Sequence, residues 1–350
     1  MWPSCAWQTA RVGLFRRRQP ERDAAQHPIS AFWAWWTTEG NGIDPHRATK
    51  ATEELTRRVA AIHPDLTWHF GPGVAAEHRL TVSAGGVAAV RPAAERWLRA
   101  APAPDKTWEY RASQEADPDA LASTLEIAGH EVDLSLTRFR VDPVEEELRV
   151  HVGVYHPAFA EMSGDVRDRI TFLLLDWILG EDDVERWLGH IEPLQVPPAA
   201  VASAEELRAA VDSMAQSRSP DTWSLAQWLD KDGLPGLAVV RRGLRWIDHP
   251  TLDRHHVLTR SYTAQENGQP LDSSTLDELH SVEVDLESAI GRQAVLVGHE
   301  THAGARRFHV YSDGEDQNVD ATLGNFATSH GLSVEARADP AWTDVRHLTG

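Results

Sequence analysis

TLDELHSVEVDLESAIG, residues 275–291, carries the clearest helical pattern in the sequence. Its apolar residues recur every three or four positions, which places them on one side of a helix. Thr275 and Glu278 have the spacing of a capping box, and Gly291 suits the residue that ends a helix. The sequence therefore predicts a helix whose apolar stripe consists of Leu279, Val282, Leu286 and Ile290.

Alternating apolar residues on both sides of this helix predict strands, and a second helical pattern follows with Asp320 as its expected cap. The predicted order is strand, helix, strand, strand, helix, strand, over residues 255–263, 275–290, 293–300, 306–313, 321–330 and 332–339. This βαββαβ order is that of a ferredoxin-like sandwich. We therefore expect such a sandwich in the C-terminal third.

The N-terminal third repeats a related order in different residues. The patterns predict helix, strand, strand, helix, strand over residues 51–66, 67–71, 78–86, 92–101 and 107–113. The middle third predicts a hairpin formed by 130–142 and 146–156, a buried helix over 165–179 and a shorter helix over 184–191. A Pro and Ala connector near 196–204 gives the best boundary.

These patterns predict an α+β protein made of two or three tandem ferredoxin-like (βαββαβ-type) sandwiches with antiparallel sheets. A chain of 350 residues is long enough for two or three domains. The expected division is a basic, disordered tail (1–28), an N-terminal module (29–120), a middle module (121–200), a connecting helix and strand (201–248) and a C-terminal domain (249–350).

ISAFWAWWTTEG, residues 29–40, places four large aromatic rings within five residues. Exposed rings could stack on bases or sugars, but residues 29–45 contain no Lys or Arg to contact a phosphate. At helical spacing the rings form an apolar stripe, which favours burial in a core. The predicted core anchors are Phe32, Trp35, Trp36, Trp68 and Trp108.

The charge balance is strongly acidic, with 34 Lys and Arg against 53 Asp and Glu and a net charge of -19. Because phosphate contacts need clustered cations, direct nucleic-acid binding is disfavoured, and a basic protein is the favoured partner. No apolar run is long enough to span a membrane, and no secretory signal is recognisable, so we expect a cytoplasmic protein. Cys5 is the only cysteine, which argues against disulfides and thiolate zinc sites.

Short motifs give no catalytic residue, no cofactor site and no metal site. HETH, residues 299–302, lacks the i, i+4 helical spacing of zinc metalloproteases, and its two imidazoles should face opposite sides of a strand. The acidic segment 312–320 lacks the ligand order of a calcium loop and is expected to be a solvated turn. The sequence also contains none of the familiar phosphate-binding, dinucleotide or serine-hydrolase motifs.

FWAWW (32–36), HRLTVSAGG (78–86) and the segment from NGQPL (267–271) to DPAWTD (339–344) resemble the domain-of-unknown-function family DUF695. The C-terminal part is also similar to the type B regulator of ribonuclease E activity. The second resemblance implies a ferredoxin-like domain that inhibits an enzyme by binding it. Neither resemblance transfers a binding residue to this chain.

On the predicted hairpin strand 306–313, Phe308 and Val310 should face the helices. Arg307, His309 and Tyr311 should then line the open face as protein-contact residues. We therefore expect a non-catalytic, cofactor-free regulator that binds another protein, such as a basic nuclease. Two alternatives remain: a hydrolase with a His and carboxylate site between domains, and an immunity protein that neutralises a toxin.

Overall fold

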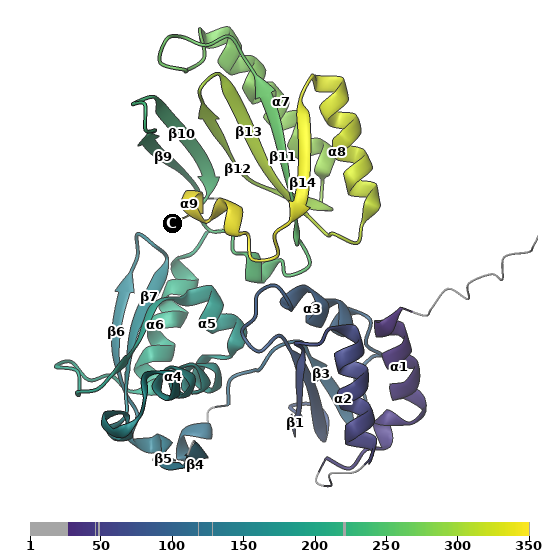
Figure 1. The fold of residues 1–350 in the computed structure, drawn as a ribbon, viewed down its shortest axis with the longest axis vertical. Coiled ribbons are helices and arrows are strands. Elements are labelled where there is room, and N and C mark those ends of the chain that lie inside the picture. The colour runs from purple at the N-terminus through teal and green to yellow at the C-terminus, as the bar shows by residue number, and fades with distance from the viewer. Residues whose placement is uncertain are drawn as a thin grey trace, which may run out of the picture.

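The computed structural model of the protein describes residues 27–45, 47, 50–117, 119–127, 129–219 and 222–349. These residues form three α+β units, one at each corner of a triangle (Figure 1). Cys5 and the predicted basic tail, up to residue 26, lie outside the described residues. None of the described helices is long and apolar enough to cross a bilayer.

The N-terminal unit packs three helices against a three-stranded sheet of order β1-β2-β3. β1 and β2 are antiparallel, whereas β2 and β3 run parallel because α3 crosses over between them. The predicted element order is confirmed, but three strands with a parallel pair do not form a βαββαβ unit. The elements are α1 (Pro28–Thr38), α2 (Lys50–Ile62), β1 (Thr67–Pro72), β2 (His78–Ser83), α3 (Arg91–Arg99) and β3 (Trp108–Arg111).

Aromatic side chains fill the core of this unit, as the sequence predicted. Phe32, Trp35, Trp36 and Trp108 are buried, and the indole N–H of Trp36 donates to the Tyr110 hydroxyl at 2.9 Å. The predicted anchor Trp68 differs, because it is only half-buried at the edge of the core. The prediction that the aromatic stretch is buried in a core is therefore confirmed, and Trp68 lies at the edge of this core.

The middle unit packs α4, α5 and α6 on a sheet of order β6-β7-β8. β7 and β8 run parallel, so the expectation of purely antiparallel sheets is wrong here and in the N-terminal unit. The shorter helix ends at Trp187, earlier than predicted, and 188–194 is a strand. The elements are β4 (Thr124–Ile127), β5 (His130–Asp133), β6 (Arg138–Val144), β7 (Arg149–Tyr155), α4 (Gly164–Leu179), α5 (Glu181–Trp187), β8 (Leu188–Leu194) and α6 (Ala204–Ser217).

Helix α6 belongs to the middle unit, because Leu207 and Val211 are buried in its core. A capping box of Ser203 and Glu206 begins this helix. The predicted boundary near 196–204 therefore lies inside this unit. The predicted connecting segment 201–248 is divided, since its strands join the C-terminal sheet.

The C-terminal unit contains a six-stranded sheet of order β14-β11-β13-β12-β10-β9, with all described pairs antiparallel. The predicted order of strands and helices from β11 to β14 is confirmed, and the hairpin β9-β10 extends the sheet at β12. The tandem arrangement is not found, because this order of elements occurs once among the described residues. The elements are β9 (Trp223–Leu229), β10 (Pro235–Arg241), β11 (Arg254–Ser261), α7 (Ser273–Ile290), β12 (Ala294–His302), β13 (Ala305–Ser312), α8 (Gln317–His330), β14 (Ser333–Ala338) and α9 (Arg346–Thr349).

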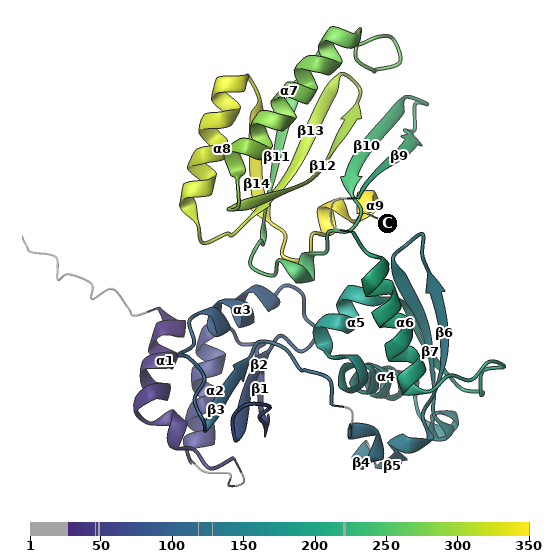
Figure 2. The same cartoon turned by 180° about the vertical axis from the view of Figure 1, so that it is seen from behind.

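Helices α7 and α8 cover one face of the sheet, with β9 and β10 lying beside α7 (Figure 2). Each helix begins earlier than predicted, because Asp272 caps α7 and Asp316 caps α8 in place of Thr275 and Asp320. Phe308 and Val310 are buried in the core beneath the helices, as expected.

Arginine and carboxylate groups join the three units. Arg96 of α3 donates to Asp253 and to Asp313, at 2.6 to 3.0 Å, and so connects the N-terminal and C-terminal units. Asp248 accepts from Arg186 and Arg218, which connects the middle unit to the segment after β10. The acidic turn at 312–320 is therefore part of an interface and not only solvated.

Candidate functional site

Two of the three predicted protein-contact residues are buried. His309 and Tyr311 lie on the open face of the sheet, as predicted, but the segment 339–349 packs over them. Trp342 from this segment stacks on Tyr311 with ring centroids 4.5 Å apart. Arg307 is half-buried. The prediction that His309 and Tyr311 contact another protein is therefore wrong for this conformation.

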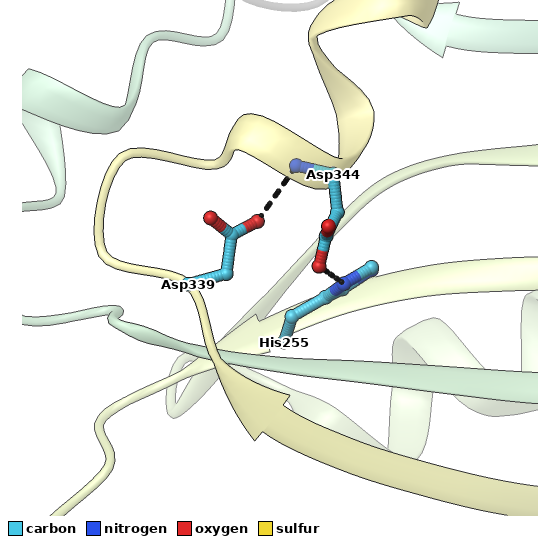
Figure 3. Close-up of side chains that lie close together, drawn as sticks. All are labelled: His255, Asp339 and Asp344. Atoms are coloured by element: carbon cyan, nitrogen blue, oxygen red, sulfur yellow. Dashed lines mark hydrogen bonds and ion pairs between the residues drawn. The ribbon is translucent and has the colours of Figure 1, made fainter.

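A cluster of three titratable residues joins this segment to the sheet: Asp339 and Asp344 belong to the segment, and His255 lies on β11 (Figure 3). His255 Nδ1 is 3.1 Å from Asp344 Oδ2, and the Asp344 N–H donates to Asp339 at 2.9 Å. One potential ligand atom from each of the three residues lies within 4.8 Å of the others. One imidazole and two carboxylates form a donor set that could hold a cation.

Protein donors already satisfy this cluster. The Tyr311 hydroxyl donates to Asp339 at 2.6 Å, and the Thr343 N–H donates to the same carboxylate at 2.8 Å. Arg337 donates to Asp344 at 2.5 Å. Because the carboxylates bind so many protein donors, the geometry favours a network that fastens 339–349 to the sheet over a metal site.

The electrostatics of the cluster agree with this structural role. Burial disfavours the imidazolium and lowers the pKa of His255 to about 4, although the bond with Asp344 opposes the change. His255 Nε2 is 3.1 Å from His309 Nδ1, and His309 Nε2 is 3.6 Å from Glu300. The pKa of Glu300 is lowered to about 2, mainly by His309. The exposed His347, whose Nε2 is 2.9 Å from Glu300, contributes less to this lowering.

The two histidines of HETH contact different elements, in agreement with the prediction that they face opposite sides of a strand. His299 is 2.9 Å from Glu283 of α7, and His302 is 3.0 Å from Asp230 in the turn after β9. Each imidazole therefore has its own carboxylate partner, and the pair does not converge on one point.

A cavity of about 570 Å³ lies between the N-terminal and middle units. Its carboxylates include Asp168, Asp176 and Asp182, and its apolar wall includes Phe172 and Trp246. Burial raises the pKa of Asp176 to about 7, and the negative charge of Glu181 adds to the effect. This cavity can present a protonated carboxylic acid to a ligand near neutral pH. Histidine is absent from the residues described as lining it.

The outer strand of the C-terminal sheet exposes apolar side chains that the sequence analysis missed. Trp223, Leu225 and Leu229 on β9 are 39%, 61% and 70% exposed and share one face of the strand. β9 pairs with β10 on one side only, so its other edge carries unpaired backbone groups among the described residues. The alternation in WSLAQWL (223–229) would have predicted this strand.

Comparisons with family models, curated proteins and solved structures return no match for this chain. The resemblance to DUF695 and to the type B regulator of ribonuclease E activity therefore stays a prediction. The geometry alone has to support a function.

Proposed function

We propose that the protein binds an extended, basic segment of another protein along the edge of β9. The observation that supports this proposal is the row of exposed apolar side chains, Trp223, Leu225 and Leu229, on an edge strand. Proteins normally protect such edges with charges or cover them, and an exposed apolar edge is a site for strand addition. Backbone hydrogen bonds would supply affinity, and the apolar residues would select alternate side chains of the partner.

Charge supports a basic partner. Helix α7 lies beside the hairpin and contains five Asp and Glu residues but no Lys or Arg. Arg241 of β10 forms an ion pair with Glu287 of this helix at 2.5 Å. A second copy of the chain would bring one acidic helix towards another, whereas a basic segment would complement it. A regulator of a basic enzyme and an immunity protein both fit this proposal.

Hydrogen exchange with a defined probe would test the edge. The probe is a ten-residue peptide of alternating valine and lysine, added at low and high salt. We expect it to protect the amides of 223–229, less so at high salt, and to lose this effect in the double variant Leu225→Glu, Leu229→Glu. Val74→Glu, at an exposed position in the loop after β1, is the matched control and should behave as the wild type. Protection elsewhere, or none, would refute the proposal.

A second candidate function is hydrolysis in the cavity between the N-terminal and middle units. Asp176, with its pKa of about 7, could act as a general acid, and Asp168 could act as a carboxylate base. Hydrolysis of chromogenic ester, phosphoester and glycoside substrates would test this candidate. Activity that is lost in Asp176→Asn and kept in Asp165→Asn, an exposed control at the start of α4, supports it. If none of these substrate classes is hydrolysed, this candidate function is excluded.

The fold assignment and the location belong to the same proposal. We assign β11 to β14 with α7 and α8 to the ferredoxin-like fold, which the strand order β14-β11-β13-β12 supports. A cytoplasmic location is supported by the single cysteine in the sequence, because secreted proteins are richer in disulfides.

A further inference from the structure

A second cavity, of about 450 Å³, lies between the middle and C-terminal units. Three arginines from distant parts of the chain line it: Arg149 on β7, Arg245 after β10 and Arg346 on α9. Histidines 151 and 190 line it too. Such a gathering of basic groups is unusual in a protein with a net charge of -19.

Arg245 is buried without a carboxylate partner. It is 5% exposed, and its guanidinium donates to the carbonyl oxygens of Glu147 at 3.2 Å and Leu148 at 3.5 Å. Its Nε has no hydrogen-bond partner, and it forms no ion pair within the described part of the chain. A buried cation without a counter-charge is costly, and an anion bound beside it would offset that cost.

Arg149 is in a similar position. Its Nη1 donates to three carbonyl oxygens at the end of α5, those of residues 185, 186 and 188, at 2.7 to 3.2 Å. It also forms no ion pair among the residues that the structure describes. Burial lowers the pKa of Arg149; the charges of Glu185 and Glu147 oppose this effect, and the charge of Arg346 adds to it. Burial likewise lowers the pKa of Arg245 to about 10, with repulsion from Arg149 and Arg218 adding to it.

Two glutamates in the lining offset part of this charge. Glu185 accepts from the indole N–H of Trp246 at 2.8 Å, and Glu147 lies 3.6 Å from His151. Both side chains belong to exposed residues. The lining therefore holds three arginines against two exposed glutamates.

We infer that this cavity binds the phosphate group of a small phosphorylated metabolite. Planar guanidinium groups can each donate two hydrogen bonds to phosphate oxygens, and arginines from three elements can surround a tetrahedral group. A dianion also matches several cations better than a carboxylate does. The volume accepts a ligand of metabolite size, in the range of small-molecule sites. This inference is independent of the β9 edge and of the cavity that contains Asp176.

Isothermal titration calorimetry with inorganic phosphate, at pH 7 and constant ionic strength, would test the site. The wild type should show saturable binding. Arg245→Gln and Arg149→Gln should each weaken it about tenfold or more, because each removes charged hydrogen-bond donors to the phosphate. Arg138→Gln is the matched control, since this exposed arginine also donates to carbonyl oxygens but lies outside the cavity.

A substitution at the exposed Arg346 provides a second variant for the test, in case a substitution at Arg245 prevents folding. Arg346→Gln should still fold, because residue 346 is exposed, and should weaken phosphate binding. No saturable binding by the wild type, or equal binding by all variants, would overturn the inference. Acetate that binds as tightly as phosphate would overturn the assignment to a dianion. A phosphoserine tripeptide that binds more tightly than a sugar phosphate would overturn the assignment to a metabolite.

Discussion

Arg91 of α3 and Asp182 of α5 form a paired hydrogen bond that joins the N-terminal and middle units. Arg91 Nε and Nη2 donate to the two carboxylate oxygens of Asp182 at 3.2 and 3.0 Å. Arg91 is buried and also donates to Glu95 at 3.2 Å. Planar, two-point recognition of this kind fixes orientation as well as distance. The relative position of the two units therefore depends on this contact.

A double-mutant cycle would measure this pair. We expect Arg91→Leu and Asp182→Asn to lower the free energy of unfolding, with a coupling energy of about 1–3 kcal/mol because the pair is largely shielded from water. Arg99→Leu on the same helix is the control, since Arg99 is exposed and its ion pair with Glu95 should contribute less than about 1 kcal/mol. A coupling energy near zero would show that the contact does not hold the units together.

The aromatic core makes a second prediction. Trp36 is 0% exposed, and a Cβ added at Gly40 would lie 2.6 Å from its ring. Trp36→Ala should therefore lower the free energy of unfolding by about 3–5 kcal/mol, measured by urea unfolding. Trp223→Ala, at an exposed tryptophan, should cost about 1 kcal/mol or less. Equal losses would contradict the assignment of Trp36 to the core.

His255 predicts a loss of stability in mild acid. Its pKa in the folded state is about 4, below the 6.5 of an unperturbed histidine, so the unfolded chain takes up the proton first as the pH falls. The contribution of the neutral His255 to the free energy of unfolding is complete above pH 6.5. It decreases by about 3 kcal/mol between pH 6.5 and pH 4. Unfolding measured across this range should show the slope in the wild type and in the exposed control His27→Gln. His255→Gln should flatten it, and an unchanged slope would refute the assignment.

Asp176 predicts the opposite pH dependence. Its folded-state pKa of about 7 lies above the ordinary 3.8, so ionisation costs stability as the pH rises from 3.8 to 7. Asp176→Asn should therefore raise the free energy of unfolding at pH 8, by about 1–3 kcal/mol, and change it little at pH 4. The exposed Asp165→Asn should have no such effect. A variant that is less stable than the wild type at pH 8 would show that the carboxylate makes a favourable contact.

Local patterns predicted most elements of the fold but not how the sheets are assembled. The α7 stripe and the aromatic helix were recognisable because their apolar spacing repeats within a few residues. The hairpin β9-β10 attaches to β12, β3 pairs in parallel with β2, and β8 pairs in parallel with β7. These pairings depend on contacts between residues that are far apart in sequence. Segment 201–248 was divided for the same reason, because no composition change marks where one core ends.

The candidate sites were less predictable. The strand pattern placed His309 and Tyr311 on the correct face, but it carries no information on the segment 339–349 that covers them. Arg149, Arg245 and Arg346 have no local motif, since they meet only after the middle and C-terminal units dock. The β9 edge could have been found, because its alternation is visible in seven residues.

The contacts of Arg96 indicate when the interface between the N-terminal and C-terminal units forms during folding. Its partners Asp253 and Asp313 lie 157 and 217 residues away, so each contact closes a long loop and forms only after both units exist. Docking steps of this kind follow the folding of the individual units. A contact absent from the transition state affects the unfolding rate and leaves the folding rate nearly unchanged. Arg96→Leu should therefore speed the unfolding of the assembled protein, and stopped-flow kinetics would show whether the three units separate before they unfold.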